Sequence, residues 1–313
     1  MRLSLTRIVI LISFVGLLVG DTARSATFTF APPDSTEVHG TVTSQRMRFT
    51  DSVQGPVDST SETLFRLFLV TPSGYEMIQQ PLSIITRRDG QVTKNPLFGI
   101  LADTEIKYRL DSNGYARHVS GYEDVRKKAE EMLPQYADAI RKSMDPRLMA
   151  EEEQARWNAQ IPILSGKQAK PGDIAYGTVT APLPDGSRLN VYVVCTVTDT
   201  SRVEGELIAH IDHKSDSEFE RLAKTLGRST EELAEAMNLP DSVVSGNNEN
   251  RQGDTRTSMQ FTIEVATMLV REQHSRTETT ITVVGPDNRM RHIRQVKSED
   301  IEFGRQQIRE SSK

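Results

Sequence analysis

Hydrophobic and polar residues alternate along much of the first third of the chain, and this period of two predicts β-strands. Residues 36–52, 62–70 and 74–88 are rich in β-branched and aromatic residues. A Thr-Pro-Ser-Gly turn signal separates the second segment from the third, so we expect these two to form a hairpin. Both faces of residues 64–70 are apolar except at Arg66, so we expect that strand to be covered on both sides.

The hydrophobic period changes to that of a helix at residue 120. Ser120 is followed three residues later by Glu123, which is the spacing of a capping box. Asp145-Pro146 predicts a second helix start, with the acid at the cap and proline at the first helical position. This second helix carries Trp157, the only tryptophan, and we interpret it as part of an apolar stripe that packs on a sheet.

The second half of the chain repeats this order of strands, helices and strands. The pattern predicts an antiparallel meander of three strands, then a helical hairpin at about residues 215–239, and then three more strands. Within the hairpin, Ser215 with Glu218 and Ser229 with Glu232 have the capping-box spacing, and each pair predicts a helix start. The six strands are expected at residues 174–183, 187–198, 203–213, 258–270, 275–284 and 289–296.

These patterns together predict an α+β fold that is mainly antiparallel β. We expect two antiparallel sheet units, each with packed helices. The first is expected at residues 26–160, with its helices at its C-terminal end, and the second at residues 161–313, with the helical hairpin inserted in it. Ile161-Pro162 and Pro171-Gly172 interrupt every period near residue 160, which favours a boundary there.

The first 25 residues have the pattern of a secretory signal peptide. Arg2 and Arg7 form a positive region, and an almost unbroken apolar run follows at residues 8–20. That run is shorter than the roughly 20 apolar residues that a membrane-spanning helix needs, and small residues follow it. We therefore expect cleavage after Ser25 and a soluble periplasmic or secreted protein without a transmembrane segment. An uncleaved N-terminal anchor is the alternative.

The net charge argues against a polyanionic partner. The chain has a formal net charge of −5, and removing residues 1–25 makes it more acidic because they hold three arginines and one aspartate. Nucleic acids and anionic lipids require a basic surface, and only residues 289–294 are locally basic. We therefore expect no nucleic-acid partner.

The chain contains a single cysteine, Cys195, so no intramolecular disulfide can form. Cys195 belongs to an alternating row of apolar residues that runs from Leu189 to Val197. A reactive thiol needs exposure and an electropositive setting. The row therefore predicts core packing for Cys195.

Several turns and caps resemble an uncharacterised family of exported bacterial proteins, a sheet-rich domain of unknown function. The matching residues are YRLDSNG at 108–114, VSGYE at 119–123, Ile161-Pro162 and Pro171-Gly172-Asp173. The resemblance covers most of the chain after residue 25. The family often has a tryptophan shortly after its Gly-Asp, where this chain has Tyr176. The resemblance implies a fold and no particular activity.

His210, Asp212 and His213 have the residue types of a metal site. On a strand, His210 and Asp212 share one face and His213 points to the other. At most two of the three side chains could therefore converge on one ion, whereas a closed zinc site needs about four ligands. We expect an exposed polar strand end here, with neither a metal nor a cofactor.

Residues 222–245 resemble a helix-turn-helix, with small residues where two helices would cross. Glu231, Glu232 and Glu235 lie at the start of the would-be recognition helix, where they would face phosphates. We therefore expect a helical hairpin that covers a sheet.

No catalytic motif is present. The chain has neither a Gly-x-Ser-x-Gly elbow nor a His-Glu-x-x-His helix. We expect a non-catalytic envelope interaction or scaffold protein that binds another macromolecule through a sheet edge or a helix face. A hydrolase without a recognisable motif is one alternative.

The other alternative is a periplasmic carrier of an apolar ligand, on the general plan of periplasmic lipoprotein carriers. A carrier needs a pocket of roughly 300–1,000 Å³, and Phe65, Phe68 and Tyr192 are the candidate walls. We expect the helices to fill the interior instead, because they carry enough apolar residues to cover the strands.

Overall fold

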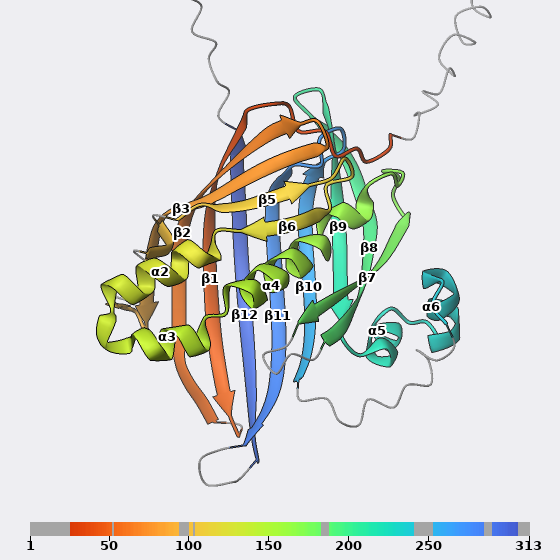
Figure 1. Ribbon diagram of the computed structural model, residues 1–313. Coiled ribbons are helices and arrows are strands. Elements are labelled where there is room, and N and C mark those ends of the chain that lie inside the picture. Colours follow the sequence, from red (N-terminus) through yellow and green to blue (C-terminus); the bar gives the residue numbers. More distant parts are fainter. Residues whose placement is uncertain are drawn as a thin grey trace, which may run out of the picture.

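The strands of this protein form one curled antiparallel sheet (Figure 1). The computed structural model describes residues 26–51, 53–93, 100–102, 104–182, 188–240, 253–284 and 290–305. In these residues the sheet has 12 strands in the order β6-β5-β3-β2-β1-β12-β11-β10-β9-β8-β7, with β4 paired to β3. The helices α2 to α4 lie inside the curve of the sheet, and we call the sheet surface on that side the concave face.

The strands are β1 (Thr36–Thr50), β2 (Val53–Thr71), β3 (Gly74–Arg88), β4 (Gln91–Thr93), β5 (Ile106–Leu110), β6 (Ala116–Ser120), β7 (Ile174–Pro182), β8 (Arg188–Val203), β9 (Glu206–Asp216), β10 (Gly253–Glu264), β11 (Val270–Val284) and β12 (Met290–Arg305). The helices are α2 (Tyr122–Met132), α3 (Ala137–Ser143), α4 (Pro146–Asn158), α5 (Phe219–Thr225) and α6 (Thr230–Met237), with 3₁₀ turns η1 (Pro134–Tyr136) and η2 (Ile161–Leu164). None of the described helices is long and apolar enough to cross a membrane.

The fold is mainly antiparallel β, as predicted, but the expectation of two sheet units is wrong. β1 pairs with β12 along its whole length, from Val38 opposite Arg305 to Thr50 opposite Ile293. The first and last long strands are therefore neighbours in one sheet, which contains strands from both residues 26–160 and residues 161–313. Backbone pairing between such distant segments leaves no local sequence signal, because any two extended strands can form it.

Two helix starts were predicted correctly and two were not. Asp145 caps α4 by accepting hydrogen bonds from the backbone N–H groups of Arg147 and Leu148, and Ser229 and Glu232 form the capping box of α6. The expected capping box of Ser215 with Glu218 is absent, because α5 begins after Glu218 and its cap has no side-chain hydrogen bond. The expected capping box at Ser120 is absent, because α2 begins after Gly121, whose φ is 110° and whose cap has no side-chain hydrogen bond. A β-carbon at Gly121 would lie 2.3 Å from the carbonyl oxygen of Glu105. The close packing of Gly121 against the backbone of Glu105, just before β5, therefore determines where α2 begins.

β8 is covered on both faces by two separate cores. Val191, Val193, Cys195 and Val197 belong to the main core on the concave face, whereas Tyr192 belongs to a second core beneath α5 and α6 on the outer face. The predicted packing of Cys195 is confirmed. Its side chain is buried, and burial raises the pKa of the thiol to about 12, so the thiol stays protonated at neutral pH.

The prediction that residues 64–70 are covered on both sides is wrong. Leu64 and Phe68 are buried, but Phe65, Leu67 and Leu69 on the other face are only partly buried. The helices therefore cover one face of β2.

The end of the concave face near β5 and β6 is filled by an apolar core. The segment that starts at residue 26 contributes Phe28 and Phe30 to it. Phe30 makes an edge-on contact with Phe68 at a ring distance of 6.4 Å. A β-carbon at Gly114 would lie 2.6 Å from the Phe30 ring, so glycine is required there. We call this region the filled end.

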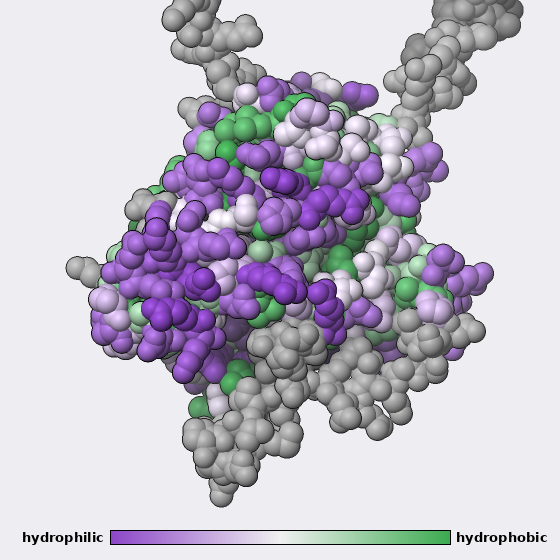
Figure 2. All heavy atoms as spheres, in the orientation of Figure 1, coloured by the Kyte–Doolittle hydropathy of each residue, from purple (hydrophilic) through white to green (hydrophobic). Residues whose placement is uncertain are grey.

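Helix α4 lies against both edge strands of the sheet, β6 and β7. The Asn158 amide accepts a hydrogen bond from the backbone N–H of Ala116 and donates one to its carbonyl, at 2.8 and 3.1 Å. Trp157 is buried and donates through Nε1 to the carbonyl of Gly114 at 2.8 Å, which agrees with its predicted packing role. Exposed sheet edges invite pairing with other chains, and α4 covers both. Its outer surface is hydrophilic (Figure 2).

Candidate ligand-binding groove

A groove of about 310 Å³ lies between α4 and the concave face, next to the filled end. We call it the α4 groove. Its lining comes from α4, from the residues that follow it and from β7 to β12, so strands from both the middle and the end of the chain build it. The lining residues are Glu152, Ala155, Arg156, Ala159, Gln160, Val179, Ala181, Val191, His213, Ser215, Thr255, Thr257, Met259, Gln273, Ser275, Thr277, Thr279, Gln295, Lys297 and Glu299.

The floor of the α4 groove consists of strand residues in direct register. Residues that lie opposite each other on paired strands point to the same face of a sheet, so each cross-strand row presents its side chains together. One row runs His213, Met259, Ser275, Glu299 and the next runs Ser215, Thr257, Thr277, Lys297.

The floor is rich in hydroxyl groups that bond to one another. The Oγ1 atoms of Thr257 and Thr277 are 3.0 Å apart, and those of Thr255 and Thr279 are 3.3 Å apart. Each hydroxyl has one donor and two acceptor sites, so these pairs retain capacity for a further partner. The floor therefore offers a ladder of hydrogen-bonding groups.

Small and apolar side chains also line the α4 groove, beside the charged Glu152 and Arg156 of the helix. Ala155 and Ala159 come from α4 and its C-terminal cap, while Val179, Ala181 and Val191 come from β7 and β8. Small side chains on the helix leave space between it and the floor. A molecule in the groove would contact methyl groups on one side and hydroxyl groups on the other.

His213 joins the floor to the end of α4. Its Nε2 atom lies 2.9 Å from the carbonyl oxygen of Ala159, and a carbonyl only accepts, so Nε2 carries the proton. Nδ1 is then a bare acceptor, and it is buried without a hydrogen-bond partner. Burial lowers the pKa of His213, which keeps the imidazole neutral at pH 7.

Charged side chains line the groove near β12 and α4. Lys297 and Glu299 form an ion pair, and Arg156 pairs with Glu153, which also accepts a 2.7 Å hydrogen bond from the Tyr108 hydroxyl. Burial alone would raise the pKa of Glu153, but Arg156 and the Tyr108 hydroxyl lower it on balance. Glu153 is therefore an ionised, fully engaged partner of Arg156.

Two further charged residues of β2 lie near this cluster. Burial, and then repulsion from Glu299, raise the pKa of Glu62. The Arg66 guanidinium donates through Nε to Gln79 at 2.9 Å and lies 4.8 Å from the ring centre of Phe303. Arg66 thus supports the packing between the strands and α4, and neither residue lines the groove.

The three side chains predicted as pocket walls do not come together. Phe68 is buried in the main core, Phe65 packs against His39 on the outer face at a ring distance of 5.2 Å, and Tyr192 packs against Phe219 of α5 at 4.9 Å. None of them lines the α4 groove. The groove residues were missed because threonine, serine and glutamine on a strand also fit a solvent-exposed face. The available signal was their spacing of two on three neighbouring strands.

The predicted strand geometry of the histidine motif is confirmed, but the expected exposed strand end is wrong, because His213 is only 2% exposed and β9 continues to Asp216. His210 and Asp212 line a hollow of about 410 Å³ on the outer face together with His274, whereas His213 lies on the concave face. Among the described residues, no group of three or more histidine, cysteine or acidic side chains is arranged to hold a metal ion. The described residues that line this outer hollow all come from β8 to β11, so it lacks the opposed helix and sheet walls of the α4 groove.

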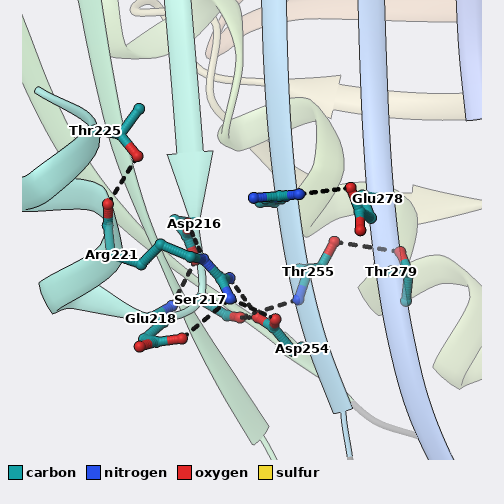
Figure 3. A network of polar contacts seen from close by, with 10 residues as sticks. Asp216, Ser217, Glu218, Arg221, Thr225, Asp254, Thr255, Glu278 and Thr279 are labelled. Carbon is teal, nitrogen blue, oxygen red and sulfur yellow. Dashed lines mark hydrogen bonds and ion pairs between the residues drawn. The ribbon is translucent and has the colours of Figure 1, made fainter. Parts of the chain in front are cut away.

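The expected hairpin over a sheet is also confirmed, since α5 and α6 pack on the outer face of β8. Figure 3 shows Arg221 of α5 pointing between Asp216 and Asp254, at 2.5 and 2.6 Å. Ser217 binds Asp254 and receives a hydrogen bond from the backbone N–H of Thr255 at 3.0 Å. The ion pairs thus fix the hairpin to the strand that supplies the groove floor.

No family model matches the chain, and no curated protein matches it. Among solved structures, a lipovitellin structure described by its lipid–protein interactions is 8% identical, with a TM-score of 0.48 over 90% of this chain and 26% of that chain. The chain thus spans about a quarter of that protein. OpdL from Pseudomonas aeruginosa is 8% identical, with a TM-score of 0.21 over 87% of this chain and 99% of that one. At TM-scores below 0.5, these likenesses do not establish a shared fold or function.

Proposed function

We propose that this protein is an exported carrier that binds a small amphipathic molecule in the α4 groove. The observation that carries the proposal is the unfilled space of about 310 Å³ between helix α4, which contributes both small apolar and charged side chains, and a hydroxyl-lined floor. Protein interiors are normally packed to the density of organic crystals. A helix that served only as a cover would bury apolar side chains on the strands beneath it.

The groove has the features of a small-molecule site. Its volume lies at the lower end of the roughly 300–1,000 Å³ that is typical of such sites, and several polar groups converge on it. The ligand of this proposal has an apolar part, which contacts Ala155, Ala159 and Val179, and a polar part, which contacts the threonine ladder. A purely apolar ligand would fit this groove less well, because it would bury the floor hydroxyls without giving them a hydrogen-bond partner, which costs free energy.

The alternative of an interaction protein that binds through a sheet edge has less support. Helix α4 lies against both edge strands, and Asn158 occupies the backbone groups of Ala116 in β6. A partner strand would have to displace this helix.

Filling the groove tests the proposal. Ala155 is 9% exposed and lines the groove, so Ala155→Phe would place a ring in it. Arg147→Phe on the same helix is the matched control, because the Arg147 side chain is 83% exposed and lies outside the lining. The readout is binding of a monomeric single-chain lipid by isothermal titration calorimetry, together with native mass spectrometry of the protein purified from its own envelope.

We expect the unmodified protein and Arg147→Phe to bind the lipid and Ala155→Phe to lose at least about tenfold in affinity. Equal binding by Ala155→Phe and Arg147→Phe, with both folded by circular dichroism, would contradict the assignment of this groove. If none of the three proteins binds the lipid, the carrier function itself is contradicted.

A further inference from the structure

We infer that the polar head of the ligand is zwitterionic, with a primary ammonium group and a phosphate. This inference rests on the proposed function, since it concerns the head that the same groove accepts. Its basis is the set of charged and acceptor groups in the lining.

The charged side chains of the lining are balanced. Arg156 and Lys297 are cations, and Glu152 and Glu299 are anions. A site for a purely anionic head would present an excess of positive charge, and a neutral head would offer none of these side chains an opposite charge. A head that carries both signs gives each of them an opposite charge.

The cations are accessible from the groove. The Arg156 side chain is 59% exposed and that of Lys297 is 31% exposed. The ion pair of Arg156 uses NH2 toward Glu153, and a guanidinium has further N–H donors in a planar fork. Arg156 and Lys297 together therefore suit the several acceptor oxygens of a phosphate.

The acceptors of the lining favour an ammonium group that still carries N–H bonds. Nδ1 of His213 is an acceptor without a partner, and Ser215, Gln273 and the Oε1 atom of Glu299, whose Oε2 pairs with Lys297, add oxygen acceptors. A primary ammonium has three donors, whereas a quaternary ammonium has none. The volume of about 310 Å³ further favours a ligand with a single chain.

Three lysophospholipids with the same acyl chain test the head. They carry a phosphoethanolamine, a phosphocholine or a phosphoglycerol head, and each is titrated into the purified protein as a monomer by isothermal titration calorimetry. We expect the phosphoethanolamine lipid to bind at least about tenfold more tightly than the other two. Equal affinity for all three would overturn the inference and leave the carrier function standing. If none of the three lipids binds, both the inference about the head and the proposed carrier function are contradicted.

Two variants connect the preference to the lining. Glu299→Gln removes an anion and should cost the phosphoethanolamine lipid about tenfold in affinity, with little change for the phosphoglycerol lipid. Lys297→Met should weaken all three lipids because each has a phosphate. Lys214→Met is the matched control, since Lys214 lies one residue from Ser215 and points to the outer face. An unchanged head preference in Glu299→Gln, with the fold intact, would overturn the inference.

Discussion

The filled end and the α4 groove are two parts of one sheet face, with the same antiparallel backbone and opposite side-chain chemistry. At the filled end, Phe30, Phe68 and Met77 close the interior. In the groove, Thr257 and Thr277 occupy equivalent alternating positions, and small side chains of α4 stand away from them. The comparison shows that the side chains at alternate strand positions decide where the helices enclose a core with the sheet and where they leave a groove.

The largest expected effect is on the stability of the filled end. Met77 is 0% exposed, so Met77→Ala should leave a closed cavity and lower the free energy of unfolding by about 2–5 kcal/mol. Met259 lines the groove, so the space left by Met259→Ala joins an open hollow and should cost less. Urea unfolding of both variants measures the difference. Equal losses would show that the two regions do not differ in packing.

A smaller effect is expected from pH, through His213. Burial lowers its pKa below the ordinary value of 6.5, so the unfolded chain binds a proton that the folded chain does not bind in the window between the two pKa values. The contribution of neutral His213 to the free energy of unfolding is therefore fully present above pH 6.5, and it is lost as the pH falls through the pKa of His213 in the folded protein. The proton would add to Nδ1, so the Nε2 hydrogen bond to the carbonyl of Ala159 remains, and the loss of stability comes from the positive charge buried at His213.

The His213→Gln variant isolates this effect. A glutamine amide can still donate to the carbonyl of Ala159 but does not titrate. We expect the free energy of unfolding of the variant to fall less than that of the unmodified protein between pH 7 and pH 5, as measured by urea unfolding at each pH. Parallel pH profiles would assign the acid sensitivity to other groups.

The smallest expected effect on stability comes from the threonine ladder. Replacing both Thr257 and Thr277 by valine removes both partners of one hydrogen bond and keeps the side-chain shape, which is nearly neutral. The double variant should unfold within about 0.5 kcal/mol of the unmodified protein, yet bind a single-chain lipid more weakly by calorimetry. A large loss of stability would mean that the ladder is part of the core.

The sequence by itself determined the local elements. Asp145-Pro146 and the Ser229–Glu232 pair specify their helix starts through contacts within one turn, and the apolar row that contains Cys195 identifies a buried strand face. These signals are local, because capping and alternation depend on residues a few positions apart.

Only the tertiary structure decided which strands are neighbours and what lies beneath α4. The pairing of β1 with β12 joins residues that are more than 200 positions apart, and the groove floor combines Ser215, Thr257, Thr277 and Lys297 from four strands. Each of these residues, taken alone, is equally suited to a solvated strand. They line one groove because the register aligns them in one row and α4, which lies against both edge strands, is placed opposite that row.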